Sequence, residues 1–462
     1  MDKDSVLHYC DQIDTLVEQI RQEVETAEPA IEWETVEAGA DLQAALNIGG
    51  AYQLAAGADF GTSGGYAFVT DNTRLRGLGN NTLVGSRGPA LRCGLEFQAA
   101  MVEDLTLGTT EYDDSIVRLG LNTLDQSDIL KVPRNFRFTR VSVPMYRGKR
   151  AFQINAADVI IEDCDIRDVY APSKQDSQAI WVGNSPGNIV VRNCHLEAAG
   201  ENMMVGGDKM KIPNCRPTNI LVENCFFTKP IEWKGNTAIP VKNLFELKDG
   251  HNVTLRLCEL WNCWSSGQIG HAIVLTPTAG ASLLGISVED CHVHDVGGIF
   301  NITGLEQHGN YPNEPRTQLH VKGGRYKTNK AVMGGRGTFA QIGCSPDYLI
   351  VEDADIEIDG TSFILIWDAK PIDTLHILNS SWNYGSYGVM INGRAHGDNS
   401  LGQIKDFKIE GCTIQGAHSA FKTRFPNNNY VEDMSLGREQ EVENDIEEEV
   451  RRIQHDFDTE AF

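Results

Sequence analysis

One short segment, KNLFELKDGHN at 242–252, combines acidic and basic residues at a spacing suited to chemistry. Because side chains alternate between the two faces of a strand, Glu246 and Lys248 are expected on the same outward face. His271 opens a similar run one repeat later, so it is expected about one strand away. These groups serve general acid–base catalysis, as in a polysaccharide lyase or hydrolase. The alternative is a surface ladder of ion pairs.

The sequence predicts no metal site and no cofactor. A lyase would also need a cation, or calcium held by acidic residues, to neutralise its substrate, so calcium is expected only if the chain is a lyase. The chain has eleven cysteines but no CxxC pair, which argues against zinc ribbons and thioredoxin-like motifs. Buried thiols are the better interpretation.

Aromatic residues offer a second kind of site, because sugar rings stack on aromatic faces that polar groups flank. The candidate glycan-binding residues are Trp181, Trp261, Trp264, Trp382, Tyr384 and Tyr387. Trp181 alternates with apolar neighbours and is expected to point outward, and the others fall at bends or loops. The alternative for each is lateral packing beneath a loop.

A repeated frame explains how such residues would be positioned. VVRNCHL (190–196) and SVEDCHV (287–293) both place a cysteine between a turn-forming Asn or Asp and a second strand-like run. Equivalent positions recur every 26 to 33 residues and always hold a small residue. They are Cys164, Cys194, Cys225, Cys258, Cys291, Gly324, Ala354, Ser380 and Cys412. A fixed period in this range, with strand periodicity, predicts a solenoid.

In a parallel β-helix, equivalent residues of successive coils stack about 4.8 Å apart. An inward position at a tight bend has room only for a small side chain, so the cysteines are expected to be reduced, buried and stacked. A third strand per coil is visible at 178–183, 243–248, 271–276, 339–343, 363–367 and 387–392.

This coil pattern resembles the right-handed parallel β-helix superfamily, which includes pectate lyases, related polysaccharide-active enzymes and phage tailspikes. The resemblance covers roughly residues 60–430. DLQAALNIGGAYQLAAGADF (41–60) is similar to the capping helix and first strand of that superfamily, and TRLRGLGNNTLVG (73–85) to its early coils. The resemblance implies an all-β, single-stranded parallel β-helix, a scaffold that carries lyases, hydrolases, epimerases and inert spikes. The superfamily's galacturonan-hydrolase and pectate-lyase motifs are absent.

Four segments are predicted: a helix or coiled coil at 1–29, a linker and capping segment at 30–60, the β-helix at 61–430 and an acidic helix at 431–462. The N-terminal segment has apolar residues at alternating spacings of four and three, namely Val6, Cys10, Ile13, Val17, Ile20, Val24 and Ala27. β-Branched residues at both core positions of such a seam favour a trimer. The alternative is a single amphipathic helix that lies on its own β-helix.

Charge and composition narrow the function. A formal net charge of −24 argues against a nucleic-acid partner. We expect neither a membrane span nor a secretory signal. The favoured interpretation is a bacteriophage virion protein, a tailspike or fibre that forms a homotrimer, contacts other virion proteins and binds a host surface polysaccharide. The alternative is a polysaccharide lyase or hydrolase. Enzymatic activity is therefore left open, and the absence of activity is the favoured interpretation.

Overall fold

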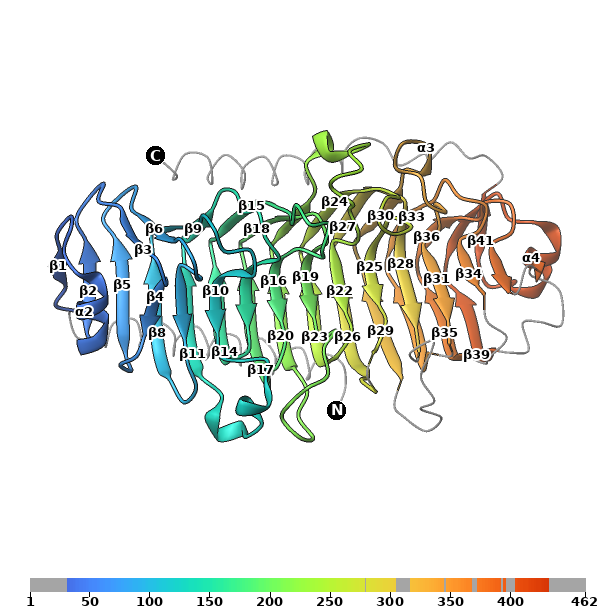
Figure 1. Cartoon of the computed structure of the whole chain (residues 1–462). Helices are drawn as coiled ribbons and strands as arrows, with labels where there is room; N and C mark the ends of the chain where they lie inside the picture. Colours follow the sequence, from blue (N-terminus) through green and yellow to red (C-terminus); the bar gives the residue numbers. More distant parts are fainter. Residues whose placement is uncertain are drawn as a thin grey trace.

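The computed structural model describes residues 31–431, apart from 279, 305–315, 345, 368–371, 392–393 and 396–403. Within these residues, three long sheets run side by side along one axis (Figure 1). We name them sheets A, B and C in the order in which the chain visits them in each coil. The helices predicted at 1–29 and 431–462 fall outside the described residues, apart from residue 431.

Each sheet contains one short strand from almost every coil. Sheet A holds β1 (Glu34–Val36), β2 (Ala51–Leu54), β5 (Thr73–Gly77), β8 (Gln98–Glu103), β11 (Arg134–Thr139), β14 (Ala157–Glu162), β17 (Gly187–Arg192), β20 (Thr218–Glu223), β23 (Gly250–Arg256), β26 (Leu283–Glu289), β29 (Thr317–Lys322), β32 (Tyr348–Glu352), β35 (Ile372–Leu378) and β39 (Ile404–Glu410). Sheet B holds β3 (Phe60–Thr62), β6 (Thr82–Gly85), β9 (Thr106–Thr109), β12 (Ser142–Val143), β15 (Asp165–Val169), β18 (His195–Ala198), β21 (Phe226–Thr228), β24 (Glu259–Cys263), β27 (His292–Val296), β30 (Arg325–Thr328), β33 (Asp355–Glu357), β36 (Ser381–Asn383), β40 (Thr413–Gln415) and β41 (Asn429–Val431). Sheet C holds β4 (Tyr66–Phe68), β7 (Leu91–Cys93), β10 (Ser115–Leu119), β13 (Arg150–Ile154), β16 (Gln178–Val182), β19 (Glu201–Val205), β22 (Phe245–Leu247), β25 (His271–Leu275), β28 (Gly298–Thr303), β31 (Ala340–Gly343), β34 (Ile364–Ile366), β37 (Val389–Ile391) and β38 (Arg394–Ala395).

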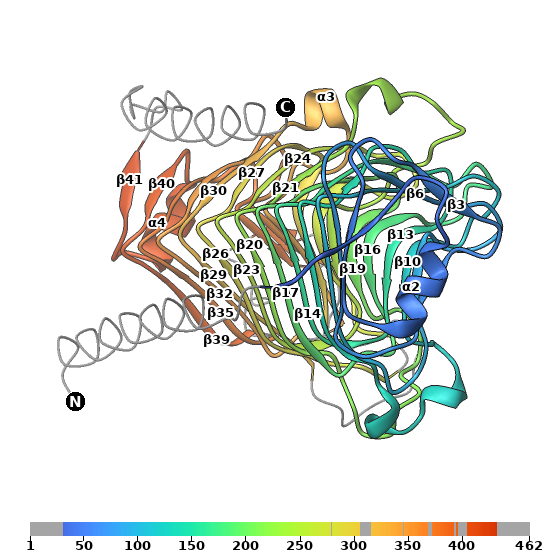
Figure 2. The ribbon, with the colours of Figure 1, turned by 90° about the vertical axis from the view of Figure 1, so that its left-hand side faces the viewer.

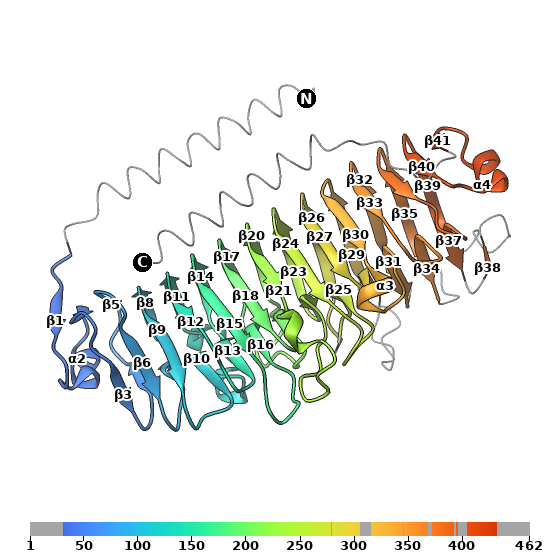
Figure 3. The ribbon, with the colours of Figure 1, turned by 90° about the horizontal axis from the view of Figure 1, so that it is seen from above.

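The strands pair in parallel throughout the described chain, except that β38 runs antiparallel to β37. The coils follow one another in chain order along the axis (Figure 3), and the view along that axis shows the sheets enclosing one interior (Figure 2). The chain is therefore a right-handed, single-stranded parallel β-helix, as the sequence predicts. All six predicted third strands are found in sheet C, as β16, β22, β25, β31, β34 and β37.

The predicted linker and capping segment contains β1, α2 (Leu42–Ile48) and β2 and reaches the first residue of β3, and these strands already pair with later coils. The side chain of Asp41 accepts a hydrogen bond of 3.1 Å from the Ala44 N–H and so caps the start of α2. Leu42 and Leu46 are buried, so α2 covers the first coil with its apolar face (Figure 2). At the other end, α4 (Ser419–Arg424) buries Phe421 in the core.

The register of sheet A confirms the predicted repeat. Glu162 pairs with Arg192, Arg192 with Glu223, and Glu223 with Arg256. In every coil, the small residue of the predicted frame lies two positions after the residue that occupies this paired position in sheet A. The small residues therefore occupy equivalent places in successive coils. They form an inward row at the bend between sheets A and B.

The cysteines of this row are buried and free. The Cys194 N–H donates to the Cys225 sulfur, and the Cys225 N–H donates to the Cys258 sulfur, each at 3.4 Å. The preceding turn residues have positive φ and form a ladder, because Asn224 Nδ2 donates to Asn193 Oδ1 at 3.0 Å. Asn is one of the few residue types that tolerates this backbone conformation and can also bridge the coils.

Thiol reactivity tests the ladder. Burial raises the pKa of the thiols of Cys164, Cys194 and Cys225 well above the ordinary range, so little thiolate is available to react. We expect the native protein to leave these cysteines unlabelled over a period in which Cys215, which is only half-buried, reacts. Alkylation followed by peptide mass spectrometry measures this directly, with unfolded protein as the control. Rapid labelling of the ladder in native protein would contradict the buried stack.

Candidate functional site

The outward face of sheet C carries an unusual set of polar side chains in its central coils. Glu246 lies on β22, and Lys248 follows the end of that strand. His271 opens β25, the next strand of the sheet, which pairs with β22 in register. The sequence-based expectation that these three residues lie together is therefore correct in geometry, and their catalytic role remains a prediction.

Glu246 is almost completely buried, yet its carboxylate has several partners. Lys248 Nζ lies 2.8 Å from its Oε1, and Asn243 Nδ2 donates to its Oε2 at 3.1 Å. The hydroxyl of Thr276, on the following coil, donates to Oε1 at 3.4 Å. A buried carboxylate is tolerated only with such compensation. These contacts hold Glu246 in one position.

A pocket of about 400 Å³ opens beside this ion pair. The predicted catalytic residues line it together with hydroxyl, amide and apolar groups. The lining comprises Glu246, Lys248, Gln268, Ile269, His271, Val274, Thr276, Pro277, Thr278, Asn301 and Thr303. We call this feature the sheet C cleft; its size falls within the range of small-ligand sites.

His271 is neutral at physiological pH. Burial lowers the pKa of His271 to about 4, and the nearby Arg336 cation acts in the same direction. Its Nε2 atom has no hydrogen-bond partner among the described residues. A neutral imidazole with an unused nitrogen can accept or donate a hydrogen bond to a ligand in the cleft.

Glu201, on β19, is a functional candidate that the sequence analysis missed. Burial, reinforced by the negative charge of Glu246, raises the pKa of Glu201 to about 7, although the Lys242 cation opposes this. Gln178 Nε2 donates to its Oε2 at 2.7 Å, and Lys242 Nζ lies 3.5 Å from its Oε1. Glu201 and Glu246 are thus neighbouring carboxyl groups with different environments, a pattern found in acid–base pairs. Glu201 does not line the cleft itself.

A buried lysine fixes the turn that presents Glu201. Lys229 Nζ donates to the carbonyl oxygens of Ala198 and Gly200 at 2.6 and 2.9 Å and to Asn202 Oδ1 at 3.0 Å. Burial lowers the pKa of Lys229 to about 8, so the ammonium remains the main form at neutral pH. Lys229 therefore acts as a rigid connection between the turn before β19 and the coil that follows it.

Most of the aromatic residues predicted to bind a glycan are buried, and this prediction requires correction. Trp382 and Tyr384 are core residues with 1% of their surface exposed, and the Trp382 ring stacks on Phe363 at 4.2 Å. Trp264 packs in a separate cluster beside α3 (Lys330–Met333) with Trp233 and Met333. None of these rings presents a face to a ligand.

Trp181 does lie on the outward face of sheet C, as the alternation predicts, but it is 2% exposed. The guanidinium carbon of Arg150 lies 4.1 Å from the ring centre, and the indole N–H donates to the Gly206 carbonyl at 3.0 Å. Its predicted contact with a glycan is therefore wrong as well. Tyr387 is 43% exposed and Trp261 is half-buried, so their role in glycan binding remains a prediction.

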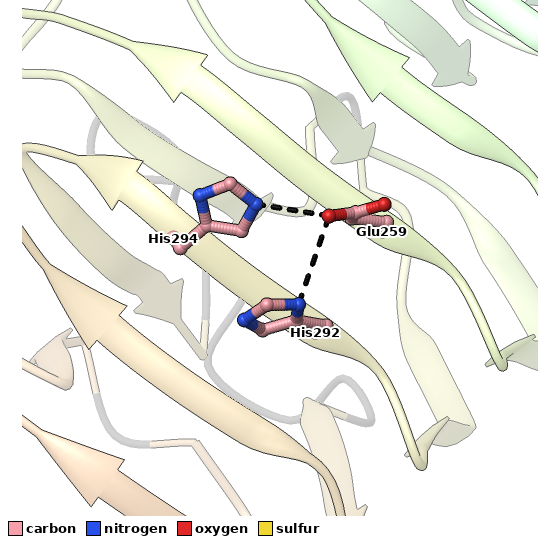
Figure 4. Close-up of side chains that lie close together, drawn as sticks. All are labelled: Glu259, His292 and His294. Atoms are coloured by element: carbon pink, nitrogen blue, oxygen red, sulfur yellow. Dashed lines mark hydrogen bonds and ion pairs between the residues drawn. The ribbon is translucent and has the colours of Figure 1, made fainter. Parts of the chain in front are cut away.

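Trp261 belongs to a second group of side chains, on the outward face of sheet B. Its ring is parallel to that of His294, with an interplanar angle of 6° and centres 6.0 Å apart. His294 in turn lies beside His292 and Glu259 (Figure 4). Glu259, His292 and His294 are not among the predicted site residues, although all three follow repeat cysteines closely. Glu259 follows Cys258, and His292 and His294 follow Cys291.

Comparisons with known proteins define the class of fold. No protein-family model matches the chain, and no curated protein sequence matches it. Among solved structures, that of PfbA, a surface adhesin of Streptococcus pneumoniae, is similar with a TM-score of 0.52 and 12% identity, over 76% of this chain and 88% of that one. This similarity shows a shared β-helix fold.

Two further solved structures match less well. A tailspike protein mutant of E. coli bacteriophage HK620 in complex with a pentasaccharide has a TM-score of 0.45 and 12% identity, over 81% of this chain and 66% of that one. The A-module of the Azotobacter vinelandii mannuronan C-5 epimerase AlgE6 has a TM-score of 0.40 and 15% identity, over 80% and 93% of the two chains. Within the described residues, no helix is both long enough and apolar enough to cross a bilayer.

The raised pKa of Glu201 predicts how stability depends on pH. The unfolded chain releases this proton near pH 4.5 and the folded chain near pH 7, so folding stability falls as the pH rises between these values. We expect Glu201→Gln to remove this loss and to raise stability relative to wild type by about 2 kcal/mol more at pH 8 than at pH 5. Urea unfolding at the two pH values measures the difference.

The matched control is Glu357→Gln, which removes a glutamate on sheet B whose side chain is 44% exposed. Its stability should follow the wild-type curve at both pH values. If Glu201→Gln also follows the wild-type curve, the carboxyl group is ionised in the native state and is not the acid form that the structure indicates.

Proposed function

We propose that this protein is a carbohydrate-binding β-helix that holds a polysaccharide in the sheet C cleft. The observation that carries the proposal is the cleft itself, a pocket of about 400 Å³ in which an ammonium, a neutral imidazole, two amides and several hydroxyls converge. Sugars present hydroxyl groups in several directions, and a site with this mixture of donors and acceptors satisfies them.

The cleft also offers apolar surface. Ile269, Val274 and Pro277 line it beside the polar groups, so the C–H face of a sugar ring can pack while its hydroxyls form hydrogen bonds. Among the described residues that line the cleft, none is a phenylalanine, tyrosine or tryptophan. This composition suits a ligand held mainly by hydrogen bonds. Lys248 is the cation among the described lining residues, and it can pair with a carboxylate or sulfate group on the sugar.

The proposal extends to a biological role as a surface-contacting appendage, which we assign to a bacteriophage virion of the tailspike or fibre type. Its ligand would be a host surface polysaccharide. It would form a homotrimer and would contact other virion proteins. PfbA, which shares the fold, is a surface adhesin, so a β-helix of this kind can contact a cell surface. The reduced cysteines of the described chain suit a protein made in a reducing cytosol.

Substitution in the cleft tests glycan binding. We expect Lys248→Met and Asn301→Ala each to weaken binding of a bacterial surface polysaccharide by about 10-fold or more, because each removes hydrogen bonds from a partly desolvated site. Lys327→Met is the matched control, since Lys327 forms a similar ion pair with Glu357 at 3.1 Å on sheet B. A glycan array followed by titration calorimetry on the glycan that binds measures the effect, with circular dichroism to verify folding.

The same experiment separates binding from cleavage, which is the second candidate function. The adjacent Glu201 and Glu246 carboxyl groups, one of them with a raised pKa, favour a hydrolase over an inert surface. We expect bound glycan to stay intact, and products that absorb in the ultraviolet, or new reducing ends, would show the opposite. Loss of those products in Glu246→Gln would then assign catalysis to the cleft. Glycan binding that is equal in all variants would place the site elsewhere.

Assembly is tested separately. The heptad seam of the N-terminal sequence predicts a homotrimer, and three copies would bind a cell surface with greater avidity than one. We expect sedimentation equilibrium to show a trimer for the full chain and a smaller species after removal of residues 1–30. A monomer in both cases, or an oligomer that the truncation leaves unchanged, would remove the role assigned to this segment.

A further inference from the structure

We infer that Glu259, His292 and His294 form a binding site for a divalent metal ion of the zinc class. The three side chains lie on the outward face of sheet B, and their ligand atoms all lie within 4.8 Å of one another (Figure 4). The site is on a different sheet from the proposed glycan cleft. It therefore does not depend on the proposed function.

The strand register places these donors. Glu259 opens β24 and His292 opens β27, and the two residues are direct neighbours in the parallel ladder. His294 lies two residues beyond His292, so it points to the same face, opposite Trp261. The backbone hydrogen bonds of two adjacent coils thus hold three ligands from two strands, and no loop is needed to position them.

The distances are close to those of a bound metal. His294 Nε2 lies 3.0 Å and His292 Nδ1 lies 3.7 Å from Glu259 Oε1. A tetrahedral zinc ion with bonds of about 2.0–2.1 Å holds its ligand atoms about 3.3 Å apart. Both separations from Glu259 Oε1 are therefore near the ligand spacing of a tetrahedral site, and the two histidine nitrogens lie within 4.8 Å of each other.

A hydrogen-bonded carboxylate orients one of the ligands. His294 Nδ1 lies 2.9 Å from Asp295 Oδ2, and Asn329 Nδ2 donates to the other Asp295 oxygen at 2.8 Å. With Nδ1–H donating to Asp295, the lone pair of Nε2 faces Glu259, as in metal sites where a carboxylate supports a ligating histidine. The Trp261 ring, parallel to the imidazole, restricts its rotation further.

The donor atoms themselves indicate which cation would bind. Imidazole and carboxylate donors suit zinc better than calcium or magnesium, which prefer oxygen ligands.

The remaining coordination position would be open. The side chains of Glu259, His292 and His294 are 18%, 33% and 24% exposed, so one side of the cluster faces solvent. Three protein ligands and an open position are typical of a metal that binds a further molecule, whereas structural zinc sites are closed by four ligands. The further ligand would be water or an oxygen donor such as a sugar hydroxyl or carboxylate.

Calorimetric titration of the full chain, purified without a histidine tag and stripped with a chelator, tests the site. We expect one zinc ion to bind per chain at pH 7.5 and the affinity to fall at pH 5.5, where protons compete. His292→Ala and His294→Ala should each weaken zinc binding by at least about 10-fold, and Asp295→Asn by about 10-fold or more through the loss of its support.

The matched control is His320→Ala on sheet A. His320 Nε2 lies 3.0 Å from Glu352 Oε1, so it belongs to a histidine–glutamate pair outside the cluster. This variant should bind zinc like the wild type. A zinc-induced rise in Tm that is present in the wild type and His320→Ala, and absent in His294→Ala, provides a second measurement. Absence of zinc binding, or binding that is equal in the cluster variants, would overturn the inference.

Discussion

Hydrogen bonding between successive coils is the constraint on which the rest of the structure depends. Parallel pairing in all three sheets fixes each residue directly above and below its equivalents, so a side chain must fit the same place in every coil. The bend between sheets A and B has room only for small residues, which is why Cys225 is followed by Cys258 and Cys291 and later by Gly324. The limited space inside the bend explains why a small residue recurs there, and the reactivity of the thiols is not needed to explain it.

The same register governs the outward faces, where like charges in one row would repel one another. On sheet A the row alternates in sign, with Glu162 beside Arg192 and Glu223 beside Arg256. Arg192 Nε lies 2.8 Å from Glu162 Oε2, and Arg256 Nε lies 2.6 Å from Glu223 Oε1. Such pairs add modest stability each. On sheet C, Glu246 pairs in register with Met204, and Glu201 lies three residues before Met204 on the same strand. An ionised carboxylate at Glu201 would be buried and would be repelled by Glu246, so this position does not gain from the alternation seen on sheet A.

The fold follows from the sequence because its repeat sets both the period and the inward positions. The burial of Trp382 also follows from the repeat. Trp382 lies two residues after the small residue of its frame, the position that Ile166 and Phe227 occupy in their own frames, and side chains at this position point into the core. Trp181 shows the limit of predicting exposure from strand alternation. Its side chain points outward as predicted, but Arg150 and the segment at Gly206 cover it, and alternation does not predict where these groups lie. Glu201 was missed because its burial and its proximity to Glu246 depend on how neighbouring coils stack, which the strand sequence ENMMV does not show.

The triad on sheet B shows what the repeat could have revealed. When the frames are aligned on their cysteines, Glu259 and Trp261 fall in the same outward positions as His292 and His294, so the cluster is visible in CELWN and CHVHD. The periodicity places residues but does not orient imidazole rings, and the hydrogen bond to Asp295 comes only from the structure. A stacked solenoid lets neighbouring coils assemble such a site from two strands while the remaining coils carry the stability. Groups that lower the stability of the fold locally, such as Glu201, are tolerated for the same reason. The destabilisation that they cause is limited to their contacts with the coils on either side.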